Sequence, residues 1–235
     1  MAGAAVMNFC SNCGARVAYR VPPGDSLPRH VCDACGTIHY QNPKLIVGCV
    51  AEWQERILLC RRAIEPRHGL WTVPAGFLEN GETTAAGAMR ETLEEANARI
   101  EIDGLFAIWN IPHISQVYML FRGRLLDPDV SPGAETLEVK LVTEEEVPWQ
   151  QIAFATVRNT LTHYFNDRRQ GEFRLHMGTI EPMARGVTER RDRQASPTNG
   201  CRSLCSRLCS CGSRRLGCRE VAADARSRLP SPAWR

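Results

Sequence analysis

Two apolar runs in the first third of the chain favour a pair of strands. Residues 44–53 (KLIVGCVAEW) and 56–63 (RILLCRRA) are rich in aliphatic side chains, and a short polar turn around Glu55 separates them. Runs of this length joined by so short a turn are typical of a β-hairpin. An α/β domain is therefore expected to start near residue 42.

Further runs continue the pattern toward the C-terminus. Residues 98–111 and 115–126 have strand-like patterning, and residues 137–142 (LEVKLV) repeat it before an acidic turn. Residues 156–167 (TVRNTLTHYFND) instead place apolar side chains at helical spacing. The order of strands and helices predicts an α/β fold whose ordered part ends near Pro182.

An amphipathic helix is predicted between the two groups of strands. Thr83 is a suitable N-cap, and Asn97 suits the left-handed conformation that ends a helix. At about 100° per residue, three carboxylates fall within an arc of roughly 100°, and the apolar side chains cluster on the opposite side. One face is expected to pack in the core and the other to carry acid. The acidic face holds Glu91, Glu94 and Glu95, and the expected core face holds Ala85, Ala86, Met89, Leu93 and Ala96.

Charge is distributed unevenly along the chain. The 235 residues carry a net charge of +3, but residues 184–235 hold 12 Arg and 4 acidic residues, which leaves 17 basic and 22 acidic residues before them. An acidic body argues against a nucleic-acid-binding surface on the folded part. Residues 183–235 lack hydrophobic periodicity and are expected to form a disordered Arg- and Cys-rich tail.

Neither a membrane helix nor an export signal is apparent. No stretch approaches the roughly 20 consecutive apolar residues that a membrane span needs, and the N-terminus lacks a basic region followed by a long apolar run. The chain is therefore expected to be cytoplasmic, with no membrane partner. In that compartment the 11 cysteines favour metal binding over a disulfide framework.

Four of these cysteines form two CxxC pairs with 18 residues between them, and a glycine follows each pair. A two-residue gap directs both thiolates at one ion, and two such knuckles complete a closed tetrahedral site, which is typical of structural Zn²⁺. The alternative, a thioredoxin-like redox pair, needs only one CxxC and a βαβ context that is missing here. The neighbouring His30 and His39 are interpreted as bystanders. A zinc ribbon is predicted over residues 8–38, with Cys10, Cys13, Cys32 and Cys35 as ligands.

The acidic face of the predicted helix indicates a second metal site. Carboxylates three and four residues apart repel one another, so their grouping favours a bound cation, and oxygen ligands select Mg²⁺ or Mn²⁺. Gly87 would leave room on this face for backbone or phosphate, and the carbonyl of Gly76 could add a ligand. A solvated acidic face on a surface helix is the alternative.

The spacing of the segment from Gly76 to Ala98 resembles the Nudix signature G-x5-E-x7-R-E-U-x-E-E-x-G-U, in which U is a bulky aliphatic residue. The resemblance implies a Nudix-type α/β/α sandwich with a mixed sheet over residues 42–182, preceded by the zinc ribbon. The matching positions are Gly76, Glu82, Arg90, Glu91, Glu94 and Glu95, and the departures are Thr92, Asn97 and Ala98.

The resemblance also implies Mg²⁺-dependent hydrolysis of a nucleoside diphosphate derivative by water attack on a bridging phosphorus. Arg90 would orient the carboxylates by pairing with a glutamate such as Glu82. The metal ligands would be Gly76, Glu91, Glu94 and Glu95, and the general base stays open among Glu94, Glu95, Glu135 and Glu138.

Two Nudix subgroups share the order of ribbon and Nudix domain. Bacterial NADH pyrophosphatases carry an SQPWPFP-like segment after the signature, of which this chain keeps only Ser115 and Gln116. Residues 110–125 and FRLHMGTI (173–180) are more similar to plant plastid-type FAD and ADP-ribose pyrophosphatases. ADP-ribose or FAD is therefore the predicted substrate, with NADH or capped RNA as alternatives.

Aromatic side chains near the signature are candidates for stacking on a nucleotide base. Packing of two of them, Trp109 and Tyr118, within strands is the alternative. A homodimer fits the habit of the family, and a nucleotide-sensing regulatory or nucleic-acid-binding protein is the hypothesis from another class. The substrate-binding candidates are Trp109, His113, Tyr118 and Phe154.

Overall fold

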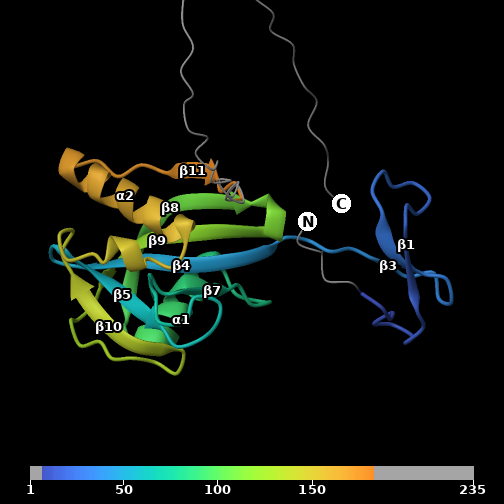
Figure 1. Cartoon of the computed structure of the whole chain (residues 1–235), viewed down its shortest axis with the longest axis horizontal. Coiled ribbons are helices and arrows are strands. Elements are labelled where there is room, and N and C mark those ends of the chain that lie inside the picture. The colour runs from blue at the N-terminus through green and yellow to red at the C-terminus, as the bar shows by residue number, and fades with distance from the viewer. Residues whose placement is uncertain (1–6, 183–235) are drawn as a thin grey trace, which may run out of the picture. The chain divides into compact units, whose positions relative to one another are not determined.

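The computed structural model describes residues 7–182, which include a small N-terminal sheet and a larger α/β domain (Figure 1). The small sheet is antiparallel in the order β1-β2-β3 and pairs Val17 with Cys32 and Val31 with Ile38. Its strands are β1 (Val17–Arg20), β2 (Arg29–Cys32) and β3 (Ile38–His39).

The larger domain is built on a mixed sheet in the order β10-β5-β4-β9-β8-β11, with β6 paired to β5 and β7 paired to β4. The pairs β4–β9 and β8–β11 are parallel, and the pairs β8–β9, β4–β5 and β5–β10 are antiparallel. The strands are β4 (Lys44–Trp53), β5 (Arg56–Arg62), β6 (Trp71–Thr72), β7 (Ala75–Phe77), β8 (Ile100–Ile111), β9 (Gln116–Leu125), β10 (Thr136–Val142) and β11 (His176–Thr179).

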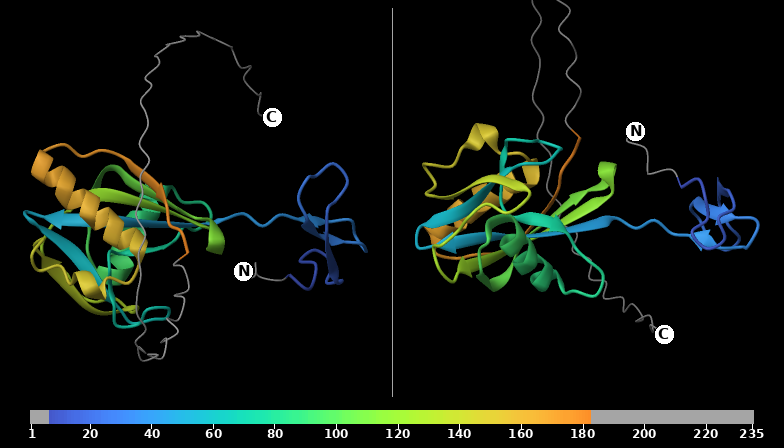
Figure 2. Two further views of the ribbon diagram at one scale, coloured as in Figure 1. Left: turned by 45° about the horizontal axis from the view of Figure 1, so that its top comes forward. Right: turned by 90° about the horizontal axis from the view of Figure 1, so that it is seen from below.

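Two helices cover opposite faces of this sheet, as Figures 1 and 2 show. The helix α2 (Ala155–Gln170) packs on one face, and α1 (Thr84–Ala96) packs on the other. Short 3₁₀ turns lie at Pro112–Ile114 and Trp149–Gln151. The expected α/β/α sandwich with a mixed sheet is confirmed.

Alternation along β4 explains how one sheet serves two cores. Val50 belongs to the cluster on the α2 side, whereas Val47 and Cys49 belong to the cluster on the α1 side. Successive strand residues point to opposite faces, so a strand covered on both sides is apolar throughout. The expected hairpin is also confirmed, because Trp53 pairs with Arg56 across the turn that contains Glu55.

The helix caps of α1 are confirmed, but its predicted core face is only partly right: Ala96 is buried and Ala85 packs against the core, whereas Ala86, Met89 and Leu93 are exposed. The Thr83 hydroxyl accepts the Ala86 amide, and Asn97 adopts the left-handed conformation with φ 49°. Met89 and Leu93, however, are 43% and 49% exposed. The helix instead buries the side that carries two of its acids, so amphipathicity alone gave the wrong orientation. The buried residues of α1 are Gly87, Ala88, Glu91, Thr92, Glu95 and Ala96.

Among residues 7–182, no helix is both long and apolar enough to span a bilayer. The predicted tail at residues 183–235 lies outside the described residues.

Candidate functional site

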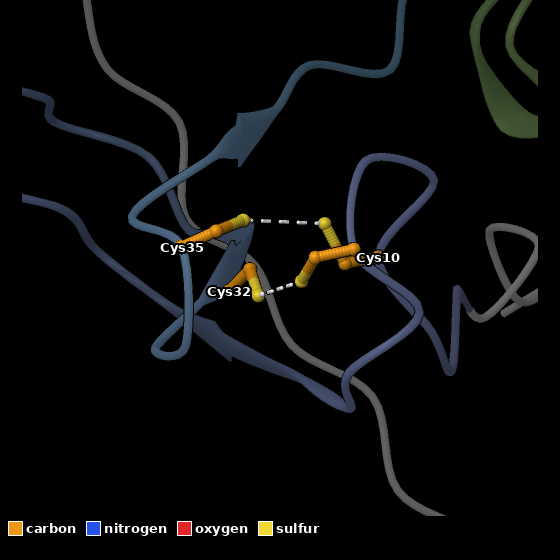
Figure 3. A group of neighbouring side chains, drawn as sticks. Cys10, Cys32 and Cys35 are labelled. Carbon is orange, nitrogen blue, oxygen red and sulfur yellow. Dashed lines mark hydrogen bonds between the residues drawn. The ribbon is translucent and has the colours of Figure 1, made fainter.

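The four predicted zinc ligands converge beside the small N-terminal sheet. Figure 3 labels three of them, Cys10, Cys32 and Cys35. The four Sγ atoms all lie within 4.8 Å of one another, with Cys10 and Cys35 3.7 Å apart and Cys13 and Cys32 3.5 Å apart. Glycines with φ of 75° and 73° follow the two CxxC pairs, as the tight turns of the knuckles require. Four convergent sulfurs fit a closed tetrahedral Zn²⁺ site.

Polar groups around two of the cysteines, Cys10 and Cys35, favour their thiolate forms. The His39 Nε2 atom lies 3.2 Å from the Cys10 sulfur, so His39 is a hydrogen-bond partner of the cluster and not the bystander that was predicted. The Asn12 amide also donates to Cys10, at 3.4 Å. The hydroxyl of Thr37 lowers the pKa of Cys35 to about 5. Such contacts to ligand atoms hold a structural metal site in its bound form.

The carboxylate cluster lies between α1 and the strands β4 and β7. Glu91 and Glu95 are 9% and 8% exposed, whereas Glu94 is exposed to solvent. A Cβ atom added to Gly76 would come within 2.3 Å of the Glu91 carboxylate. A larger residue at position 76 would displace the Glu91 carboxylate from this position beside β7, which gives the first position of the signature a physical reason.

Arg90 ties the acids together, as predicted. Its Nε and Nη2 donate to the two carboxylate oxygens of Glu82 at 3.1 and 2.8 Å, and its Nη1 donates to Glu91 at 2.7 Å and to Glu94 at 3.0 Å. The hydrogen bonds from Arg90 lower the pKa of Glu82 to about 2. The expected pairing of Arg90 with Glu82 is confirmed. It fixes the guanidinium beside the cluster in a bidentate geometry.

The room that Gly87 provides is used by protein. A Cβ atom there would meet the Glu82 carboxylate and the Val47 side chain, both at 2.8 Å. Of the two expected uses of this space, approach by protein is the one observed, and approach by phosphate stays a prediction. Gly87 lets the helix pack tightly on β4 and lets Glu82 reach Arg90.

Glu95 carries the feature that best fits a cation. Its Oε2 is buried without a hydrogen-bond partner among the described residues. Burial, followed by the neighbouring Glu91, raises the pKa of Glu95 to about 8, and burial also raises the pKa of Glu91. A buried carboxylate without a partner is costly unless a cation or a proton neutralises it. The oxygen-only donor set fits a hard divalent ion such as Mg²⁺ or Mn²⁺.

Of the two loop candidates for the general base, Glu135 comes two residues after Gly133, whose amide donates to the Glu95 carbonyl at 3.0 Å. Burial is the main cause that raises the pKa of both Glu91 and Glu95, and the charge of Glu135 adds to it. Glu138 instead lies on β10 with the Lys140 ammonium at 2.9 Å and the Arg61 guanidinium at 3.6 Å. The bond from Lys140 lowers the pKa of Glu138, which weakens it as a base. With both carboxylate oxygens of Glu138 paired to cations, Glu135 is the better candidate of the two, and the identity of the general base stays a prediction.

The aromatic candidates are placed very differently from one another. Trp109 is only 5% exposed, and its indole N–H donates to the Thr160 hydroxyl at 2.8 Å, so the proposal that it stacks on substrate is corrected. His113 is exposed on a 3₁₀ turn. Tyr118 is half-buried, and Arg62 acts electrostatically on both Tyr118 and Glu95.

Two residues that sequence reasoning missed border the cluster. The Arg62 guanidinium stands 5.2 Å from the ring centroid of Phe154 and is the cation that acts on Glu95. Phe77 directly follows Gly76, is 52% exposed, and has the Lys44 ammonium 5.1 Å from its ring centroid. Phe77 could have been predicted as a site residue because it directly follows the signature glycine. The strand pattern around Arg62 does not distinguish it as a site residue.

Comparison with protein families identifies both parts of the chain. The model described as "NUDIX domain" matches residues 42–165, and the model described as "Nudix N-terminal" matches residues 8–41. A crystal structure of a NUDIX hydrolase from Nitrosomonas europaea is 56% identical, covers 74% of this chain and 100% of that one, and superposes with a TM-score of 0.71.

Curated relatives give two kinds of name. An "NAD-capped RNA hydrolase NudC" from Vibrio vulnificus is 31% identical over 68% of this chain and 62% of its own length. An "ADP-ribose pyrophosphatase" from Methanocaldococcus jannaschii is 32% identical over 31% of this chain and 43% of its own length. The chain thus spans less than two thirds of the length of these relatives.

Proposed function

This chain belongs to the Nudix family, and from that premise we propose that it hydrolyses the pyrophosphate bond of a nucleoside diphosphate derivative with the help of Mg²⁺ or Mn²⁺. The observation that carries the proposal is the buried pair Glu91 and Glu95, which includes a carboxylate oxygen without a partner among the described residues. A surface helix used only for solubility would not bury these charges against a strand.

Different residues of the chain would bind the metal, orient its ligands and accept the proton. Glu91, Glu94, Glu95 and the carbonyl of Gly76 would hold the metal. A bound divalent ion neutralises charge on the diphosphate and lowers the pKa of a coordinated water. Arg90 orients Glu91 and Glu94 through the hydrogen bonds described above. Glu135 is the carboxylate best placed to accept a proton from the attacking water.

The substrate would extend from the carboxylates across Arg62 and the aromatic side chains. Arg62 offers a guanidinium for phosphate, which it can bind in a planar bidentate manner. Tyr118, Phe154 and Phe77 offer half-buried or exposed rings on which a base or flavin can stack. These groups suit ADP-ribose or FAD. The name of the Vibrio vulnificus relative favours a second candidate, the NAD cap of an RNA.

A substrate panel tests both candidates. The full chain is incubated with ADP-ribose, FAD, NADH and NAD-capped RNA, each with Mg²⁺ or Mn²⁺, beside Glu95→Gln and the matched surface variant Glu101→Gln. Glu101 is exposed and pairs with Arg124 on β9. We expect turnover of at least one substrate by the wild type and by Glu101→Gln, and a kcat/KM about 10³-fold lower for Glu95→Gln.

Two outcomes would contradict the proposal. Hydrolysis by Glu95→Gln at the wild-type rate would remove the carboxylate cluster from the chemistry. Tight nucleotide binding without turnover by the wild type would instead favour a nucleotide sensor.

A further inference from the structure

Asn97, the C-cap of α1, also contacts the loop of residues 131–135 through its side chain. The Asn97 Nδ2 atom lies within hydrogen-bond distance of three acceptors, the carbonyl of Ser131 at 3.2 Å, its hydroxyl at 3.1 Å and the carbonyl of Pro132 at 3.2 Å. The Asn97 backbone amide meanwhile donates to Leu93 and caps the helix. The Nudix signature has glycine here, and glycine could make the backbone contact but none of the side-chain ones.

The loop lies directly on the last turn of α1. The Ser131 amide donates to the carbonyl of Ala96 and the Gly133 amide to that of Glu95, both at 3.0 Å. A Cβ atom on Gly133 would come within 1.7 Å of the Glu94 carbonyl oxygen, so the two backbones are in contact. These bonds satisfy carbonyls at the helix end that have no partner within the helix.

Two residues after this contact comes Glu135. Its carbonyl accepts the Ala63 amide at 2.8 Å, and the following Thr136 amide donates to Gly133 at 3.1 Å. Glu135 is thus held between the end of α1 on one side and the end of β5 on the other. Because residues 131–135 have no helix or strand of their own, their position depends on these few bonds.

We propose that Asn97 is a positioning residue, which holds the loop of residues 131–135 against α1 and thereby sets Glu135 beside the carboxylates. This inference rests on the proposed pyrophosphate hydrolysis. Asn97 would not touch substrate. Its role would be to keep Glu135 at a fixed distance from the reacting water, where small displacements reduce the rate strongly.

The test is Asn97→Gly, which keeps the left-handed helix end and removes only the side-chain amide. With the substrate that the wild type turns over, we expect kcat to fall about tenfold while KM changes less than about twofold. Gln54→Gly is the matched control, because Gln54 is also a left-handed polar residue, with φ 56°, but lies in the β4–β5 turn. It should behave as wild type. An unchanged kcat for Asn97→Gly would overturn the inference.

A double-mutant cycle tests the route through Glu135. If Asn97 acts by placing Glu135, Asn97→Gly should cause no further loss of kcat in a Glu135→Gln background. An equal tenfold loss in both backgrounds would show that the two residues act independently, and the positioning role would be wrong.

Hydrogen exchange separates this inference from the proposed function. In Asn97→Gly we expect the amides of Ser131 and Gly133 to exchange at least about tenfold faster, with no such change in Gln54→Gly. If the wild type hydrolysed nothing on the panel, the proposed function would fail and the exchange rates alone would decide whether Asn97 holds the loop. Unchanged exchange at both amides would overturn the inference.

Discussion

The helices α1 and α2 cover opposite faces of one sheet, yet large apolar side chains dominate only the buried face of α2, and the buried face of α1 combines two carboxylates with small residues. The longer helix, α2, presents Val157, Leu161 and Phe165 to the core, each at most 2% exposed. The shorter helix, α1, turns Glu91 and Glu95 inward and leaves Leu93 at its surface. One helix thus follows the rule that apolar residues are buried, and the other breaks it where the metal site is proposed.

Each helix also buries an acidic residue, and the two acids differ in their hydrogen-bond partners. On α2, the Oδ2 of Asp167 accepts the Arg174 amide at 2.9 Å and contacts His176 Nε2 at 2.8 Å. On α1, one oxygen of Glu95 has no such partner among the described residues. A hydrogen-bonded buried acid is compatible with a stable fold, whereas an unsatisfied one costs stability unless a cation or a proton neutralises it.

The largest effect should come from converting each buried acid to its amide and measuring turnover. Glu95→Gln should lower kcat/KM by about 10³-fold, because a metal ligand is lost, while Asp167→Asn should keep it within about threefold. Without Mg²⁺, Glu95→Gln should be as stable as the wild type or more so at pH 8, since Glu95 ionises more easily once unfolded. A Glu95→Gln protein that is inactive because it is unfolded would contradict this interpretation.

Leucine truncation on the two helices should give the next largest difference. Leu161 is fully buried, so Leu161→Ala should lower the free energy of unfolding by about 2–5 kcal/mol. Leu93→Ala, at a position 49% exposed, should change it by about 0.5 kcal/mol or less. Urea denaturation of both proteins measures the contrast. Equal losses would mean that α1 packs through the face predicted from its amphipathic pattern.

Much of this contrast could not have been predicted from the pattern of apolar residues. The hairpin, the strands and both caps of α1 follow from local rules, and the CxxC spacing places all four cysteines together. The orientation of α1 does not follow from local rules. Met89 and Leu93 have the apolar character of core residues, and only the structure shows that α1 turns Glu91 and not these two residues toward the sheet. The motif spacing located the acids, but it could not show which way they face.

Residues far apart in sequence were the hardest to assign. The aromatic side chain of Trp109 is of a kind that stacks on nucleotide bases, yet its indole N–H donates to the Thr160 hydroxyl of α2 within the core. Glu135 and Glu138 stand three positions apart on one segment, and they are distinguished only by tertiary structure: the turn of Glu135 follows Gly133, which bonds to α1, whereas Glu138 pairs with Arg61 on β5. Tertiary packing decided each of these cases.

Asp167→Asn should have a moderate effect on stability. Burial acts to raise the pKa of Asp167, but the Arg174 amide and His176 outweigh it, so the pKa lies below 3.8. The contribution is therefore present above about pH 4 and lost as the pH falls through the native pKa. We expect Asp167→Asn to be about 1–3 kcal/mol less stable at pH 7, and this difference should shrink as the pH falls below about 4. A difference that did not depend on pH would contradict the charged hydrogen bonds.

The smallest and sharpest contrast lies in two buried threonines, one on each helix. Both are 0% exposed, and each hydroxyl donates to the carbonyl one turn earlier, Thr92 to Ala88 at 2.7 Å and Thr160 to Thr156 at 2.8 Å. Only Thr160 also accepts a bond from another element, the indole N–H of Trp109. Thr160→Val should leave that donor buried without a partner and cost about 1–2 kcal/mol.

Thr92→Val, by contrast, should change the free energy of unfolding by about 0.5 kcal/mol or less, because the Ala88 carbonyl that loses the hydroxyl still accepts its backbone hydrogen bond within the helix. It also restores the aliphatic residue of the signature. Equal losses in the two variants, measured by urea denaturation, would show that the Trp109 bond contributes nothing. A large loss of stability for Thr92→Val alone would mean that the Thr92 hydroxyl stabilises the side of α1 that carries the carboxylates. The threonine would then be a stabilising departure from the signature.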